Sequence, residues 1–267
     1  GFNQSVSYLN ENILSYQKQF NTNHSISTLV GFTFQNNIEN SLSSGAAGFP
    51  SDALSFYNLQ SGTVPGVPNT SYQDWTILSY LGRINYTFKD KLLVTLSGRS
   101  DGSSRFGKDN KWGYFPSGAL AWRISREKFM NRIDFIDDLK LRTSYGLTGN
   151  QEIGLYNSIS RFSSVQGVIG SPLVAFVGYV PTSLANNDLK WEINKQYDLG
   201  LDISVLKDRI SITADYYNKR TEDLLANLPI PGSSGFSSIL INSGSIENRG
   251  FEIGLKATVL ESKDFTW

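Results

Sequence analysis

Two glycine-rich runs in the middle of the chain have spacings that occur in enzymes. Residues 98–102 read Gly-Arg-Ser-Asp-Gly and fit G-x-S-x-G, the turn that presents a nucleophilic serine. That turn needs a strand before it, a helix after it and a histidine later in the chain. Here another strand pattern follows, and the single histidine, His24, comes earlier. We therefore expect no nucleophile at Ser100.

The adjoining run, residues 102–108, fits the phosphate-binding pattern G-x-x-x-x-G-K. The next residue is Asp109, whereas a phosphate loop has serine or threonine there to coordinate Mg²⁺. No helix follows that could direct its N-terminal dipole at a phosphate. A tight loop whose glycines supply positive φ angles accounts for the run. No nucleotide site or other cofactor is predicted.

The other candidate groups also lack the arrangement that covalent chemistry needs. Asp137-Asp138 and Glu222-Asp223 are adjacent pairs, and neighbours on a strand point to opposite faces, so neither pair is placed for acid–base work. His24 follows a turn, where we expect an exposed residue rather than a metal ligand. The absence of cysteine from the sequence excludes thiolate metal sites, and zero net charge argues against a nucleic-acid partner.

Most of the chain alternates between apolar and polar residues, as β-strands with one apolar face do. In residues 112–124, Trp112, Tyr114, Leu120 and Trp122 share one face. The same period predicts strands over residues 13–20, 24–34, 78–88, 92–99, 139–148, 196–205, 210–217 and 251–259, with residues 1–12 too irregular to assign. Pro116 removes a ladder donor inside its strand and predicts a bulge or a missing ladder bond.

The connections between these strands alternate in length. Short ones are expected at residues 21–23, 89–90, 206–208 and 261–263, and a connection of middle length, residues 125–137, is expected to hold a helix over residues 126–130. Long ones are expected at residues 35–74, 102–110, 149–190 and 222–243. In an antiparallel meander this places the tight turns at one end and the long loops at the other. Outer-membrane barrels have that asymmetry, with short periplasmic turns and longer extracellular loops.

The spacing of Trp112 and Trp122 also fits a membrane. They lie ten residues apart on one face. At ~3.3 Å per residue and a tilt of ~40°, they are separated by about 25 Å along a barrel axis, the height of the band between aromatic girdles. We expect Trp112 and Tyr114 at the outer interface and Trp122 at the inner one. Alternation alone leaves a soluble all-β sandwich, such as a carbohydrate-binding module, as an alternative.

A series of motifs runs in order from about Asp74 to Lys256. They are RSDGSSRFG (99–107), KWGYFPS (111–117), AWR (121–123) with EKFM (127–130), LKLRTSYG (139–146), TGNQ (148–151), LKWE (189–192) with KQ (195–196), DYYNKRT (215–221) and GSIENRGFE (244–252). In order and spacing they resemble the barrel of SusC/RagA-type TonB-dependent transporters of Bacteroidetes.

The resemblance implies an all-β, antiparallel, up-and-down transmembrane barrel of roughly 22 strands with short helices in its long extracellular loops. Residues 1–267 would form about ten of these strands, as a fragment that lacks the plug, the TonB box and the final strands. It further implies an outer-membrane location and a non-enzymatic role. That role is the import of a glycan or peptide, with a SusD-like lipoprotein as lid and TonB, reached through the missing N-terminal part, as energy source.

Candidate contact residues for a substrate or lid follow from this resemblance. On the expected loops they are the aromatics Phe56, Tyr57, Phe162, Tyr179 and Phe236, which would stack on sugars, hold the lid or pack the loops. On the polar strand faces they are Arg83, Arg99, Arg142 and Asp202, which would touch substrate or form a network on the lumen wall.

Overall fold

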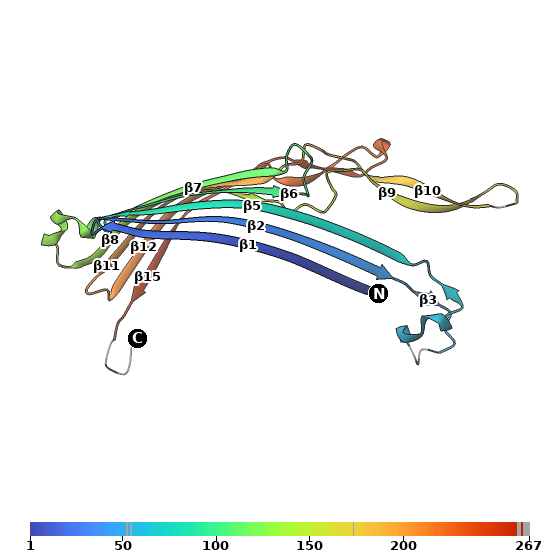
Figure 1. The fold of residues 1–267 in the computed structure, drawn as a ribbon, viewed down its shortest axis with the longest axis horizontal. Coiled ribbons are helices and arrows are strands. Elements are labelled where there is room, and N and C mark those ends of the chain that lie inside the picture. The colour runs from blue at the N-terminus through green and yellow to red at the C-terminus, as the bar shows by residue number, and fades with distance from the viewer. Residues whose placement is uncertain (52, 54, 173, 261–262, 264–267) are drawn as a thin grey trace.

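The computed structural model describes residues 1–267 except 52, 54, 173, 261–262 and 264–267. Its main element is one antiparallel layer of nine strands in the order β1-β2-β5-β6-β7-β8-β11-β12-β15, so each strand pairs with its neighbours in the meander (Figure 1). The strands are β1 (Phe2–Asn21), β2 (His24–Ser43), β5 (Asn69–Phe88), β6 (Leu92–Ser103), β7 (Trp112–Arg123), β8 (Ile136–Asn150), β11 (Glu192–Val205), β12 (Ile210–Glu222) and β15 (Ser245–Ala257).

Smaller elements lie in the connections. Three two-stranded pairs are β3 (Ala46–Ala47) with β4 (Val64–Pro65), β9 (Arg161–Ile169) with β10 (Val174–Ser183), and β13 (Leu225–Pro229) with β14 (Ser238–Asn242). Four 3₁₀ turns are η1 (Ser55–Ser61), η2 (Ile124–Arg126), η3 (Lys128–Arg132) and η4 (Gly232–Ser234). In Figure 1 the tight turns gather at the left end of the sheet, while β3 and the β9–β10 hairpin lie at the other end. The predicted separation of turns from loops is confirmed.

The strand register gives the sheet two chemically different faces, because directly opposite residues of paired strands share a face. One row across the sheet, from β2 to β15, is His24, Phe88, Leu92, Trp122, Leu141, Leu201, Ala214 and Ile253. The adjacent row, on the other face, is Ser25, Thr87, Leu93, Ala121, Arg142, Gly200, Asp215 and Glu252. The alternation read from the sequence therefore assigns both faces correctly.

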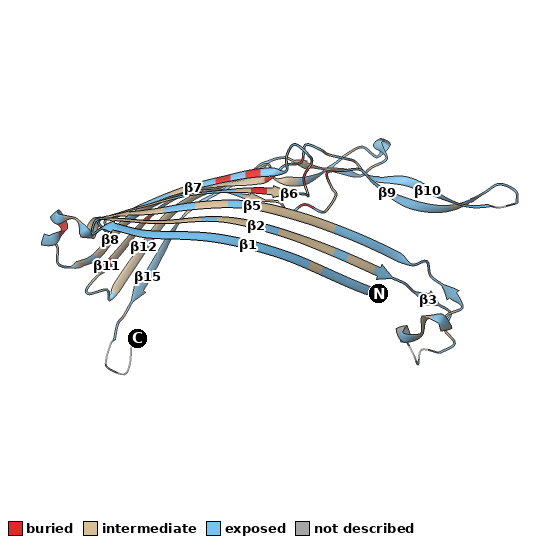
Figure 2. Ribbon diagram, viewed as in Figure 1, coloured by how far each residue is buried: buried red, intermediate tan, exposed pale blue. Residues whose placement is uncertain are grey.

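No second sheet covers the main layer in the described part of the chain, and its residues are mostly exposed or intermediate (Figure 2). Phe251 and Ile253 are 81% and 79% exposed, and Leu120 is 43% exposed. A soluble sandwich would bury these side chains against a second sheet, but the described residues form a single main layer. The described residues therefore do not form the carbohydrate-binding sandwich, and the open apolar face agrees with the expected barrel wall.

Several predicted boundaries were wrong where strands run beyond the membrane. Residues 2–12 belong to β1, β2 continues to Ser43 and β5 begins at Asn69, so the connection expected at residues 35–74 is confined to residues 44–68. These extensions pair continuously although rich in Asn, Gln and Ser, because a strand in water on both faces needs no alternation. The helix expected over residues 126–130 is replaced by η2 and η3, and the loops 149–190 and 222–243 contain hairpins.

The strand around Pro116 has a missing ladder bond but no bulge. On the β6 side, pairing runs through Pro116 opposite Gly98 without a shift of register. On the β8 side, pairing ends at Ser117 opposite Gly146, next to the proline that has no N–H. Beyond this point the Phe115 ring lies against Trp191, with ring centroids 5.4 Å apart. Proline therefore stands where β7 and β8 separate to admit an aromatic side chain.

Candidate binding surfaces on the polar wall and the loop end

An ion-pair network on the polar face joins three strands. Arg142 on β8 donates from Nε to the two oxygens of Asp202 on β11, at 3.1 and 3.2 Å, and from Nη2 to Asp215 on β12, at 2.8 Å. Lys140 Nζ lies 2.7 Å from the same Asp202 carboxylate. The network is half-exposed, so its charges contact water and are held in place by one another.

Gly200 makes this network possible. It lies on β11 between Arg142 and Asp215 in the register. A Cβ atom at residue 200 would lie 2.6 Å from Arg142 Cζ and closer still to Asp215 Oδ1. The missing side chain therefore lets the guanidinium cross over β11 to reach β12.

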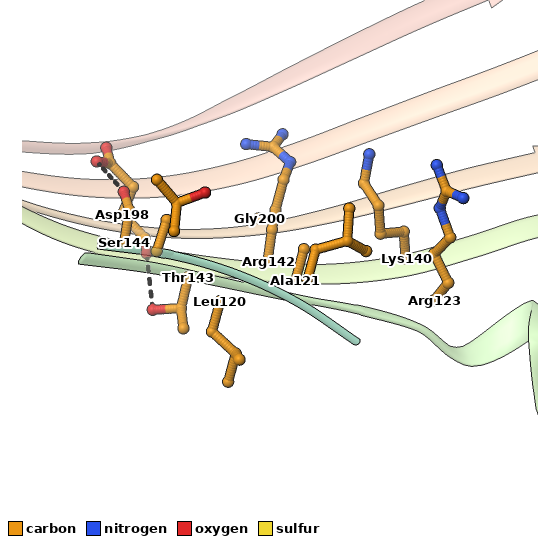
Figure 3. A pocket seen from close by; sticks show the side chains of 12 residues that line it. Leu120, Ala121, Arg123, Lys140, Arg142, Thr143, Ser144, Asp198 and Gly200 are labelled. Atoms are coloured by element: carbon orange, nitrogen blue, oxygen red, sulfur yellow. Dashed lines mark hydrogen bonds between the residues drawn. The ribbon is translucent and has the colours of Figure 1, made fainter. Parts of the chain in front are cut away.

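A shallow cavity of about 320 Å³ adjoins the network (Figure 3). The side chains of Arg123, Lys140 and Arg142 project to one side of the sheet and that of Leu120 to the other. Within the cavity wall, Ser144 Oγ donates to the Asp198 carboxylate at 3.0 Å. The surface is thus polar, charged and suited to a hydrated ligand.

A second cavity, of about 340 Å³, lies nearer the loop end and is lined by Arg83, Arg99, Phe115 and Ser117 among others. Arg99 is held by Asp101, at 2.7 Å, and by Ser79, at 3.0 Å. Arg83 is exposed and has no ion pair or hydrogen bond to any described residue. The wall of this cavity therefore contains the Arg99 guanidinium, which is held by hydrogen bonds, the Arg83 guanidinium, which has no ion pair, and the Phe115 ring.

The loops are tied to the wall by a buried cluster at the same end. Phe106, Phe115, Ile153, Leu189 and Trp191 pack together, and each is at most 8% exposed. Trp191 Nε1 donates to the Lys111 carbonyl at 3.1 Å, and Arg105 Nη1 donates to the Ile153 carbonyl at 2.9 Å. Three connections, residues 104–111, 151–160 and 184–191, are thereby fixed against β7.

The β9–β10 hairpin projects from this end and carries no charge beyond Arg161 at its base. Residues 162–183 contain no Asp, Glu, Lys or Arg. Ile169 and Val174 on one face are 65% and 59% exposed, and Val177 and Tyr179 on the other are 58% and 76% exposed. An isolated hairpin is marginally stable in water, and apolar patches of this kind mark interaction sites. The hairpin therefore presents a surface that a partner would cover.

The other loop aromatics come from three different connections of the main sheet. Tyr57 in η1 is 83% exposed, and Phe56 lies in the same turn with its side chain outside the described part of the structure. Phe162 is 64% exposed at the base of the β9–β10 hairpin. Phe236 is half-buried beside a cavity of about 560 Å³ between this base and β14, which Arg161 also lines. Contact of these aromatics with a substrate or a lid stays a prediction.

Two further findings concern groups that could hold a metal and segments that could cross a membrane. Among the described residues, no three His, Asp or Glu side chains come together as a metal site. No helix in the described part of the chain is long and apolar enough to span a membrane.

Comparison with known proteins gives the family. The family described as "TonB dependent receptor-like, beta-barrel" matches residues 1–267. The chain belongs to the TonB-dependent receptor family. This receptor chain is 40% identical over 266 residues to TonB-dependent receptor P3 of Formosa agariphila, covering all of this chain and 26% of the relative. It is 40% identical over 203 residues to TonB-dependent receptor SusC of Bacteroides thetaiotaomicron, covering 72% of this chain and 19% of that one.

Solved structures agree with this family and fold. The RagAB peptide transporter superposes with a TM-score of 0.88 at 30% identity, covering 99% of this chain and 29% of that chain. The siderophore receptor PirA of Pseudomonas aeruginosa superposes with a TM-score of 0.60 at 14% identity, which shows a shared fold alone. The receptor chain is thus a partial barrel in the outer membrane, spanning 19–29% of the length of these TonB-dependent relatives.

Within this receptor chain the structure joins some of the predicted residues. Arg142 and Asp202 form an ion pair, and Arg83 and Arg99 line one cavity. Sequence reasoning missed Asp101 and Lys140 as their partners. The sequence showed that acidic and basic residues lie on the polar faces of neighbouring strands. Which of them pair depends on the strand register, which the sequence does not give.

Two other predictions concern the apolar face of the receptor. Trp112, Tyr114 and Trp122 are 44%, 69% and 37% exposed on it, so their place at the membrane interfaces stays a prediction. His24, expected to be exposed, is instead half-buried with Nδ1 2.7 Å from the Tyr86 hydroxyl. The short turn places it opposite aromatic residues of β5.

Proposed function

We propose that the whole protein imports a glycan or a peptide across the outer membrane. It would act with a SusD-like surface lipoprotein as lid and with TonB as energy source, through binding and gated passage rather than covalent chemistry. Family membership supports this function. The RagAB relative is described as a peptide transporter, and SusC is among the similar proteins.

The observation that carries the lid proposal is the exposed apolar surface of the β9–β10 hairpin, which has no charged residue after Arg161. A surface with exposed apolar side chains on both faces gains stability when a second protein covers it, because burial contributes roughly 25 cal/mol per Å². The hairpin also lies at the loop end, where an extracellular lipoprotein would meet the barrel. We assign it as the main contact for the lid.

The polar wall is proposed as the passage that the substrate follows. Its two cavities are lined by Arg142 and by Arg83 with Arg99, respectively. Asp202 is paired with Arg142, and Arg83 has no charged partner in the described part of the chain. A hydrated glycan or peptide passes such a surface without the desolvation cost that an apolar wall would impose.

The test replaces hairpin side chains in the full-length protein. Val165, Phe176 and Val180 share one face of the hairpin, and changing all three to serine removes much of the apolar surface at the centre of that face. If the lid packs on this face, we expect the lid lipoprotein to be lost on purification and uptake of the natural nutrient to fall at least tenfold, the factor that corresponds to about 1.4 kcal/mol.

The matched control is Val67→Ser, which changes another loop residue that is 75% exposed. It should leave both lid retention and uptake unchanged. If the triple variant retains the lid and the control behaves identically, the hairpin is not the lid contact. The unaltered protein is tested in a strain whose growth depends on it. If that protein imports neither a glycan nor a peptide, the import function itself is wrong.

A further inference from the structure

The turn end of the apolar face combines aromatic rings with lysines. One row across the strands is Lys18, Ile26 and Tyr86. In the row next to the turn on the same face, His24 lies opposite Phe88. These residues share the lipid-facing side of β1, β2 and β5. The ring centroids of His24 and Phe88 are 5.0 Å apart. The end of this face is therefore an aromatic surface with cations at its border.

Two of these cations, Lys18 and Lys89, lie over aromatic rings. Lys18 Nζ lies 5.1 Å from the centre of the Phe20 ring, and Lys89 Nζ lies 5.1 Å from the centre of the Phe88 ring. Neither forms an ion pair with any acidic group in the described part of the chain. By contrast, nearby Lys91 is paired with Glu127 at 2.7 Å. Lys18 and Lys89 thus differ from Lys91 in having an aromatic ring, and no carboxylate, as the neighbour of the ammonium group.

The position of both lysines matches the headgroup layer. Lys18 lies three residues before Asn21, where β1 ends at its turn. Lys89 directly follows Phe88, where β5 ends. Lysines at the ends of membrane strands extend their ammonium groups to the interface, and aromatic rings occupy the same level. There the ammonium groups meet lipid phosphates.

We infer that this surface, formed by Lys18, Phe20, His24, Tyr86, Phe88 and Lys89, binds anionic phospholipid headgroups in the leaflet that faces the turns. A zwitterionic headgroup carries its own cation beside its phosphate. The phosphatidylglycerol headgroup has no cation, so two ammonium groups without an ion-pair partner favour it. The apolar row above them accommodates the acyl chains. This inference depends on the barrel lying in a membrane and not on what it imports.

The test uses the full-length protein in nanodiscs of phosphatidylglycerol and phosphatidylcholine in equal amounts. Lipids retained after transfer to detergent are counted by native mass spectrometry. We expect phosphatidylglycerol to be retained in preference, and the double variant Lys18→Gln/Lys89→Gln to lower that preference roughly fivefold for each lysine removed.

The control, Lys108→Gln/Lys111→Gln, removes two exposed lysines from the loop end and should change nothing. Equal retention of the two lipids by the native protein, or an unchanged preference in the Lys18/Lys89 variant, would overturn the inference. Displacement of the lipid by an equal concentration of soluble glycerol phosphate would show that the phosphate alone is bound.

A second measurement needs no variant and decides the matter if the double variant fails to assemble. Raising the salt concentration should reduce the preference of the native protein for phosphatidylglycerol, because salt screens exposed charges. A preference that is independent of salt would contradict a site built on lysines.

Discussion

Arg142 reaches the far strand of its network because residue 200 has no side chain. Its partners Asp202 and Asp215 lie on two different strands, and the guanidinium passes over the backbone of Gly200 to meet the second. The residue types were visible in the sequence, but the role of this glycine was not. A glycine in a strand has several causes, and only the register shows which side chains need the space.

Gly200→Ala should therefore weaken the network. The new methyl group would displace the ends of Arg142 and Asp215 rather than the backbone. We expect a loss of about 1 kcal/mol in unfolding free energy, the scale of a half-exposed ion pair, measured by urea titration in lipid vesicles. Gly98→Ala is the control, because nothing lies within 4 Å of a Cβ there. Equal losses in the two variants would show that backbone flexibility, not the ion pair, sets the cost.

Glu127 makes the turn between β7 and β8 sensitive to acid. A hydrogen bond from Lys91, followed by one from the Trp122 indole N–H, lowers the pKa of its carboxyl below the ordinary value of 4.5. Because the pKa of Glu127 is lower in the folded chain than in the unfolded chain, these hydrogen bonds stabilise the fold at pH values above the unfolded pKa. Their contribution is lost as the pH falls through the folded pKa.

We thus expect the amides of residues 130 and 133, which close η3, to exchange hydrogen faster once the pH falls below about 4.5. Hydrogen-exchange mass spectrometry checks this after correction for the intrinsic rate. Glu127→Gln should exchange fast at every pH. Persistence of the acid-dependent step in that variant would contradict the assignment.

At the scale of elements, β7 gives the most direct test of which face meets lipid. Leu120→Arg places a charge on the apolar face and should cost ~2–4 kcal/mol if near the bilayer midplane, reducing assembly. Ala119→Arg, one residue away, points to the polar wall and should be milder. Assembly is measured by the mobility shift of the folded barrel on gels. Equal effects would reverse the facing assignment.

The loop cluster should be separable from the sheet. Trp191 is 5% exposed, so Trp191→Ala should cost about 3 kcal/mol locally. We expect residues 104–111 and 184–190 to lose protection in hydrogen exchange while β6 and β8 keep theirs. Phe162→Ala, at a site 64% exposed, should have no such effect. Loss of protection throughout the sheet would show that the cluster supports the barrel itself.

Sequence reasoning predicted those elements in which one face meets lipid and the other water. β5 to β8, β11, β12 and β15 alternate because each strand has two environments, and the sequence records them. The polar beginning of β1 carries no such record, since Ser5 and Tyr8 lie on opposite faces and are both exposed. The β9–β10 hairpin was also missed, because apolar residues on both of its faces resemble neither an alternating strand nor a polar loop.

At the scale of the whole molecule, the meander, the single layer and the separation of turns from loops follow from the lengths of the connections. The candidate site followed less well. Arg83 and Arg99 were found as charges on one face, but their shared cavity depends on Phe115 and on where β7 leaves β8. Such long-range placement comes from packing and not from local pattern.

The central claim is that this sheet is a membrane wall with lipid on one side and water on the other. Single cysteines placed in turn at residues 117–122 of the full-length protein, each carrying a spin label, measure the contact of every position with lipid-soluble oxygen and a water-soluble nickel complex. Labels at residues 118, 120 and 122 should favour oxygen, and those at 117, 119 and 121 should favour nickel. A uniform response along the strand, or preferences opposite to these, would contradict the account.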